Sequence, residues 1–104
     1  MSTNIYLCNN STQSVQYILN DTAITPKAEG YCILADAGAF PAQVQVTINT
    51  KDTSYACDII IHRNGSISGG QSSNGKTTCG GCEVLPPMGQ HFGQNGVTIA
   101  FCNS

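Results

Sequence analysis

The amino-acid sequence predicts a mostly β protein, a small antiparallel β sandwich or barrel stapled by three disulfides. Apolar and polar residues alternate along several short segments, which is the pattern of strands with one face in water. Three Asn-Gly pairs, which favour tight hairpin turns, occur in the second half of the chain. Six cysteines are spread from one end to the other, and such a set in a short chain indicates a disulfide framework. The alternative fold is an α/β sandwich with one short helix.

The chain is expected to be a single disulfide-rich secreted domain spanning residues 1–104. Domains most often run to about 100–150 residues, and no linker divides this sequence. A chain of this size buries a modest core, and each native disulfide adds about 2–4 kcal/mol of stability. The bridges therefore contribute a large share of the stability.

In the N-terminal half, strands are predicted at residues 4–8, 12–19 and 31–35. The apolar residues of segment 12–19 fit a helical spacing as well as the alternation of a strand. Few strong helix formers occur in that segment, so a strand is favoured.

In the second half, the clearest alternation lies at residues 43–49, where three β-branched apolar residues point one way. Segment 55–62 is longer and more apolar, and is predicted to be a central strand. Segment 97–102 repeats the alternation near the C-terminus, giving six to eight strands in all. If segment 43–49 lies at an uncapped edge, it would pair with a second copy, so monomer and homodimer both stay open.

The Asn-Gly pairs give three different predictions. Residues 64–65 lie between two apolar segments and are expected to form a type I′ hairpin turn. Residues 74–75 lie in a Gly- and Ser-rich stretch that reads as an exposed loop. Residues 95–96 are expected to begin the last strand.

All six cysteines are expected to be half-cystines. Fifteen connectivities are possible, and we favour bridges from Cys8 or Cys32 to the turn at 79–82, with Cys102 closing onto a strand near the N-terminal half. An aromatic residue precedes four of the cysteines, so each bridge is expected to pack against an aromatic side chain in the core. The disulfide residues are Cys8, Cys32, Cys57, Cys79, Cys82 and Cys102.

The Cys-Gly-Gly-Cys segment at residues 79–82 also fits a zinc or redox site. A structural zinc site needs two further ligands at short spacing, and no second close pair is present. A thioredoxin-type centre needs a βαβ pattern that this segment lacks. We therefore expect two half-cystines that reach different partners from one turn, and we expect no metal and no cofactor.

Composition excludes several classes of function. Four basic and six acidic side chains give a net charge of −2, so no basic patch is available for nucleic acid or an anionic membrane. No apolar run approaches the roughly 20 residues that insert across a bilayer. The chain begins without the features of a signal peptide. We expect a mature extracellular domain whose export signal has been removed and to which an initiator Met was added; the alternative is a protein that leaves the cell by another route.

Catalysis is not expected, although one enzyme class is an alternative. His62, Arg63, Glu83 and His91 supply the residue types of a small secreted ribonuclease. The helix and core-strand pattern of the guanyl-specific fungal enzymes is not reproduced. No Gly-x-Ser-x-Gly segment marks a serine hydrolase.

Binding surfaces are expected in the Gly-rich connections at 69–76 and 86–96, because such loops contribute no side chains to the hydrophobic core. An exposed Phe92 would mark a contact surface, whereas the alternative is a Phe92 folded over the sheet edge. Asn, Gln, Ser and Thr make up 35 residues, and their amides and hydroxyls also suit a carbohydrate-binding lectin. The candidate ligand-binding residues are Asn74, Met88, His91, Phe92 and Asn95.

In the last quarter of the chain, three parts form a pattern: the segment from Cys79 to Pro86, then Gly89, and then residues 96–101. This pattern resembles the end of the virally encoded fungal killer toxin family and its secreted fungal homologues. The resemblance implies a secreted α/β sandwich that inhibits competing cells, in some members by blocking calcium uptake. It transfers no functional residue, because the matching positions are structural.

Together these observations predict a small secreted cysteine-rich protein that acts by surface recognition. A fungal toxin or effector is the first expectation, and a lectin and a ribonuclease are the alternatives. The expected partner is a protein or glycan on the surface of a host or competitor cell.

Overall fold

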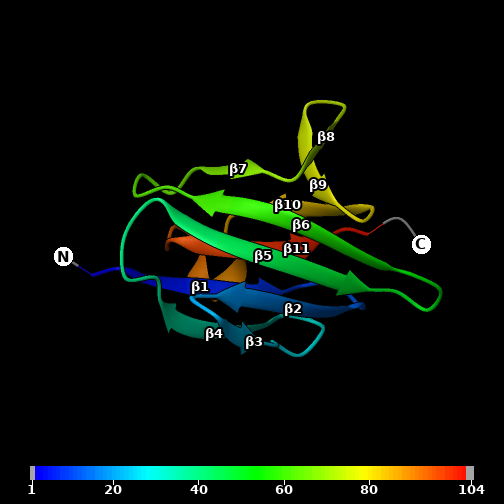
Figure 1. Ribbon diagram of the computed structural model, residues 1–104, viewed down its shortest axis with the longest axis horizontal. Helices are drawn as coiled ribbons and strands as arrows, with labels where there is room; N and C mark the ends of the chain where they lie inside the picture. The colour runs from blue at the N-terminus through cyan, green and yellow to red at the C-terminus, as the bar shows by residue number, and fades with distance from the viewer. Residues whose placement is uncertain (1, 103–104) are drawn as a thin grey trace.

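The computed structural model describes residues 2–102 and consists of two packed β-sheets (Figure 1). The six-stranded sheet contains, in spatial order, β4 (Tyr31–Asp36), β1 (Asn4–Asn9), β11 (Gly96–Ala100), β10 (Cys82–Leu85), β9 (Lys76–Cys79) and β8 (Gln71–Ser73). The five-stranded sheet contains β3 (Thr22–Ile24), β2 (Ser14–Leu19), β5 (Ala42–Asn49), β6 (Ser54–Ile61) and β7 (Ile67–Gly69). Both sheets keep open edges, so the predicted mostly β fold is confirmed as a sandwich.

The described residues contain no α-helix, and their single helical turn is the 3-10 turn η1 (Gly89–His91). None of them forms a helix long and apolar enough to span a membrane. Pairing within the sheets is antiparallel except between β1 and β11, which run parallel. The molecule measures 41 × 27 × 27 Å, and the hairpin of β8 and β9, yellow in Figure 1, projects from one end of the six-stranded sheet.

The six strands predicted from apolar patterns are all present, as β1, β2, β4, β5, β6 and β11. The number of strands was predicted too low, because residues 2–102 form eleven. The additional ones are all strands of three or four residues, namely β3, β7, β8, β9 and β10. A strand of three residues is too short to show a period of two.

Strand β5 is the middle strand of the five-stranded sheet, with β2 on one side and β6 on the other. Segment 55–62 was predicted to be a central strand, and β6 is an interior strand that pairs with β5 on one side and the short β7 on the other. The proposed pairing of segment 43–49 with a second copy was wrong, because β5 has no free edge. Alternation reveals that a strand has one wet face, and it does not reveal how many neighbours the strand has.

Strand β11 does not alternate as predicted, since all five of its residues are buried. Val97 and Ile99 face the core, and Thr98 lies on the other face. Thr98 and Cys8 line one pocket together with Met88 and its neighbours up to His91. The connection from β10 to β11 therefore covers the outer face of the sheet here.

The core lies between the sheets and consists of side chains that alternate inward along the strands. Burying each large apolar side chain contributes about 1.5–3 kcal/mol relative to leaving it exposed. The largest fully buried apolar side chains are Ile5, Leu7, Val15, Tyr17, Val44, Val46, Ile48, Ile59, Ile61, Val97 and Ile99.

The aromatic residues that precede cysteines do not pack in the core, which corrects the sequence prediction. Tyr31 and Tyr55 are exposed, as is Phe101. Tyr31 directly precedes Cys32 in β4, and successive residues of a strand point to opposite faces, so Tyr31 lies on the other side of the sheet from the cysteine. Tyr55 is two residues before Cys57 and shares its face, but it lies at the exposed start of β6. The fully buried aromatic side chain is Tyr17, which precedes no cysteine.

Tyr17 gives the folded state a dependence on alkaline pH. Its hydroxyl donates a hydrogen bond to the backbone oxygen of Cys8. Burial raises the pKa of Tyr17 well above its usual value of about 10, while a backbone hydrogen bond from Ile99 lowers it by a smaller amount. Because the folded pKa is raised, the stabilisation is fully present below pH 10 and is lost as the pH rises above the pKa of the unfolded chain.

We predict that Tyr17→Phe removes part of this alkaline sensitivity. Above pH 10 the wild-type unfolding free energy should fall by about 1.4 kcal/mol per pH unit more than that of the variant. At pH 7 the variant should be less stable by about 1 kcal/mol, because it loses a hydrogen bond. Urea unfolding at pH 7, 9, 10 and 11 measures both effects, and parallel pH profiles for the two proteins would contradict the prediction.

The crossing from the six-stranded to the five-stranded sheet depends on the fully buried Asn9. Its Oδ1 accepts hydrogen bonds from the backbone N of Ser11 at 3.0 Å and from the Ser11 hydroxyl at 2.7 Å. Its Nδ2 donates to the backbone oxygen of Gln13 at 2.8 Å. These bonds satisfy a buried amide and set the turn between β1 and β2.

The first Asn-Gly pair does connect two strands, β6 and β7, as predicted, but the turn is not type I′. Gly65 N donates to His62 O and His62 N donates to Ser66 O, both at 2.9 Å. Gly65 has a φ of 90°, whereas Asn64 is not in the left-handed region. The Asn64 side chain instead accepts hydrogen bonds from the backbone N and the hydroxyl of Ser66.

The second Asn-Gly pair was wrongly predicted as a loop, because it is the two-residue turn of the hairpin β8–β9. Asn74 and Gly75 have φ values of 53° and 76°, as a type I′ turn requires. The flanking strand β8 is fully exposed, so no buried face produced a pattern in the sequence. The third pair begins β11 at Gly96, which confirms that prediction.

Candidate functional site

All six cysteines form disulfides, which confirms the predicted framework. The bridges join Cys8 to Cys32, Cys57 to Cys79, and Cys82 to Cys102. The favoured connectivity was wrong, since Cys8 and Cys32 bond to each other and neither reaches the turn at 79–82. The reason lies in the sheet register, which places Cys8 and Cys32 directly opposite each other on β1 and β4.

The Cys-Gly-Gly-Cys segment forms the turn between β9 and β10. Cys79 and Cys82 lie opposite each other there, yet each is bonded elsewhere. The prediction of two half-cystines with different partners is therefore confirmed. Among residues 2–102, no three His, Cys, Asp or Glu side chains are grouped so that they could hold a metal ion.

The four side chains of the ribonuclease alternative have separate neighbours. His62 Nε2 lies 2.9 Å from the hydroxyl of Ser68, and Glu83 forms a 3.0 Å ion pair with Lys76. The remaining two contact aromatic rings: Arg63 lies over Phe40, and His91 stacks on Tyr6. Within the described part of the chain, no hydrogen bond or ion pair joins any two of the four.

Four of the five candidate ligand-binding residues lie in the connection between β10 and β11, which we call the 86–95 loop. This loop is fastened to β1. The ring of His91 stacks on Tyr6 with the centroids 4.0 Å apart and the planes at 30°. Tyr6 N donates to Asn95 O at 2.9 Å, and the Asn10 side chain donates to Met88 Sδ at 3.9 Å. The loop is thereby held against the outer face of the six-stranded sheet.

Phe92 is exposed, with 82% of its surface accessible to solvent. Its position is set by the backbone, since Phe92 N donates to Gly89 O at 3.0 Å and Gln94 N donates to His91 O at 3.0 Å. The alternative in which Phe92 folds over the sheet edge is not observed. The aromatic side chain is therefore presented to solvent from a hydrogen-bonded turn.

Tyr6, on which His91 stacks, connects the 86–95 loop to the free edge strand β4. Leu34 lies directly opposite Tyr6 in the β1–β4 register and is 52% exposed. Both residues line a shallow pocket of about 410 Å³ with Gly93, Gln94 and Asn95. We call the surface formed by Tyr6, Leu34, His91 and Phe92 the aromatic plateau.

Asn74 does not belong to this surface. It lies in the turn of the hairpin β8–β9, and β8 is the edge strand opposite β4 (Figure 1). The candidates thus divide into one group on the 86–95 loop and one isolated residue.

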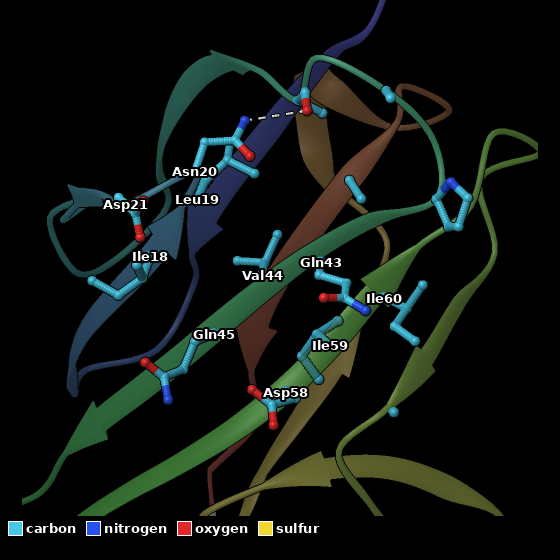
Figure 2. A pocket seen from close by; sticks show the side chains of 15 residues that line it. Ile18, Leu19, Asn20, Asp21, Gln43, Val44, Gln45, Asp58, Ile59 and Ile60 are labelled. Atoms are coloured by element: carbon cyan, nitrogen blue, oxygen red, sulfur yellow. Dashed lines mark hydrogen bonds between the residues drawn. The ribbon is translucent and has the colours of Figure 1, made fainter.

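A second recess, which the sequence did not predict, lies on the outer face of the five-stranded sheet. It has a volume of about 880 Å³ and spans β2, β5 and β6, with the turn after β2 and the segment before β5 at its rim (Figure 2). We call it the outer groove and define it by Ile18, Asp21, Gln43, Gln45, Asp58 and Ile60.

The sheet register arranges the floor of the outer groove in two rows. In the first row, Ile18 lies opposite Gln45, and Gln45 lies opposite Asp58. In the second row, Gln43 lies opposite Ile60. Cβ atoms of such directly opposed residues are about 4.5–5.5 Å apart. Each isoleucine is therefore directly opposed to a glutamine, and Gln45 is opposed on its other side to Asp58.

One hydrogen bond connects the two parts of the rim, and Figure 2 marks it with a dashed line. Asn20 Nδ2 donates to the backbone oxygen of Ala37 at 3.3 Å. This bond connects the turn that carries Asp21 to the segment that leads into β5. The only available sequence signal was the outward spacing of Gln43 and Gln45 on one strand, and of Asp58 and Ile60 on the next.

Comparisons with family models, with curated proteins and with solved structures find no match to this chain.

Proposed function

We propose that this is a secreted, non-catalytic recognition protein, a fungal toxin or effector that binds a protein on the surface of a host or competitor cell. Three disulfides in a domain of this size favour an oxidising extracellular compartment. The observation that carries the proposal is the exposure of Phe92 at the tip of a loop that is itself held in place.

An aromatic side chain in this position is a suitable anchor for a partner protein. Aromatic residues supply much of the binding energy of interfaces when they fill a pocket in the partner. A side chain whose backbone is already fixed loses less entropy on binding than one on a mobile loop. Phe92 has no role in the core, so its exposure has no structural benefit for the isolated chain.

The composition of the aromatic plateau indicates the chemistry of the partner. Its four residues are aromatic, imidazole or aliphatic, and none of them is Lys, Arg, Asp or Glu. Such a surface fits an apolar pocket rimmed by polar groups and does not fit a phosphate-rich polymer. A cell-surface protein is therefore the favoured partner.

We predict that Phe92→Ser weakens binding to the target cells at least tenfold. The oxidised protein, labelled with a fluorophore, would be titrated onto intact fungal and plant cells. Phe101→Ser is the matched control, because Phe101 is also exposed, at 61%, but lies outside the plateau. The control should bind as the wild type does.

Equal loss of binding in the two variants, or unchanged binding by Phe92→Ser, would refute the role of the plateau. Growth of competing fungal cells and necrosis of plant tissue then distinguish a toxin from an effector. In a parallel assay, wild-type protein should leave labelled RNA intact, and cleavage that depends on His62 or His91 would show that the protein is an enzyme.

A further inference from the structure

We infer that the outer groove is a second binding site, which takes an uncharged, polyhydroxylated ligand of the saccharide class. The groove and the aromatic plateau lie on opposite outer faces of the sandwich, because one is on the five-stranded sheet and the other on the six-stranded sheet. The two surfaces share no residue. The inference therefore goes beyond the proposed function and can hold or fail separately from it.

The polar side chains of the groove have the hydrogen-bonding capacity that sugar hydroxyls need. The carboxylates of Asp21 and Asp58 only accept, whereas the amides of Gln43 and Gln45 both donate and accept. A pair of neighbouring hydroxyls donates to a carboxylate and accepts from an amide. The Gln45–Asp58 pair, directly opposed across two strands, places both functions beside each other.

These side chains are free to bind a ligand. Within residues 2–102, none of the four makes a side-chain hydrogen bond or an ion pair. Gln43, Gln45 and Asp58 are exposed and stand on neighbouring strands of the sheet. Because a ligand would replace only water at these groups, it would not have to break bonds within the protein.

The apolar members of the groove complement the carbon face of a sugar ring. Ile18 and Ile60 are half-buried on this face, each next to a glutamine across the strands. A pyranose presents C–H groups on its faces and hydroxyls around its edge. The direct opposition of each isoleucine to a glutamine places an apolar contact beside a hydrogen-bonding group, which matches that distribution.

Charge restricts the class of saccharide. The described residues that line the groove include Asp21 and Asp58 but no Lys or Arg. Two carboxylates repel uronic acids, sialic acids and sulfated sugars. A neutral oligosaccharide is therefore the expected ligand.

The test is a titration of the oxidised protein with neutral oligosaccharides, namely β-glucan, mannan, xylan and chitin fragments, with polygalacturonate fragments as the acidic comparison. We expect at least one neutral oligosaccharide to bind and the acidic one not to bind. Gln45→Ala and the isosteric Asp58→Asn should each weaken that binding at least tenfold. Gln16→Ala is the matched control, because Gln16 is on the outer face of β2 but outside the groove, and it should stay within twofold of the wild type.

Three results would overturn the inference: no binding of any neutral oligosaccharide, preference for the acidic one, or equal losses in Gln45→Ala and Gln16→Ala. Thermal unfolding with the disulfides intact checks that each variant is folded. Phe92→Ser should keep its oligosaccharide binding, and Gln45→Ala should keep its binding to a cell-surface protein. The experiments can therefore refute oligosaccharide binding by the outer groove without refuting cell-surface binding by the aromatic plateau, and the reverse.

Discussion

A Gly96→Ala variant should fail to fold. The added Cβ would lie 2.1 Å from the backbone oxygen of Tyr6 and 2.7 Å from its backbone nitrogen, with Gly96 at a φ of +148°. Both atoms belong to β1, so relief of the clash requires β1 and β11 to separate at the point where Tyr6 and Gly96 pair. We expect a loss of more than about 4 kcal/mol, which approaches the whole stability of many domains.

Far-UV circular dichroism and the yield of correctly oxidised monomer measure this effect. Gly75→Ala is the matched control, because Gly75 also has a positive φ, of +76°, but its added Cβ would meet nothing within 4 Å. The free energy of unfolding of the control should decrease by about 1–2 kcal/mol, from backbone strain alone. A Gly96→Ala protein that melts within a few degrees of the control would contradict the close contact between β1 and β11.

Removing the bridge between Cys57 and Cys79 should cause the second largest decrease in the free energy of unfolding. This bridge connects β6 of the five-stranded sheet to β9 of the six-stranded sheet, and it is the one inter-sheet disulfide among the described residues. Its sequence separation of 22 predicts a contribution of about 3 kcal/mol. The double variant Cys57→Ser, Cys79→Ser should therefore melt about 12–24 °C below the wild type.

The matched comparison is Cys8→Ser with Cys32→Ser, which removes a bridge between neighbouring strands of one sheet. Its loop is of similar length, with a sequence separation of 24, but the strand it secures, β4, is an edge strand that pairs only with β1. Hydrogen exchange should then increase mainly in β4, whereas loss of the inter-sheet bridge should increase exchange in both sheets. An increase in exchange confined to one sheet after loss of the inter-sheet bridge would contradict the prediction.

The sequence was informative where one face of a strand is buried. Val44 and Ile48 of β5 alternate with polar residues, so that strand was predicted with nearly its observed bounds. The strand β8 has no buried face and gave no signal. Disulfide pairing was predicted incorrectly because it depends on register, which places Cys32 opposite Cys8 through contacts that no local pattern records.

The two candidate sites also differ in how far the sequence could predict them. The 86–95 loop is continuous in sequence, and its lack of a core pattern marked it as a candidate binding loop. The sequence left open whether Phe92 is exposed or folded over the sheet edge, and the structure shows that it is exposed. The outer groove assembles residues from β2, β5 and β6, which meet only through sheet pairing. Asp58 and Gln45 are distant in sequence and directly opposed in space, so a reading along the chain could not bring them together.

The parallel contact of β1 with β11 has a consequence for the time course of folding. Tyr6 pairs with Gly96, so strands near the two ends of the chain lie side by side. Moreover, β11 lies between β1 and β10, which means that the pair β4–β1 and the group β10–β9–β8 have no shared strand until β11 is added. The bridges Cys8–Cys32 and Cys57–Cys79 join residues that all precede β11, with sequence separations of 24 and 22, and so can form before β11 is added. The third bridge includes Cys102, which follows β11. The six-stranded sheet therefore cannot be completed until β11, which follows all of its other strands in the sequence, has been synthesised.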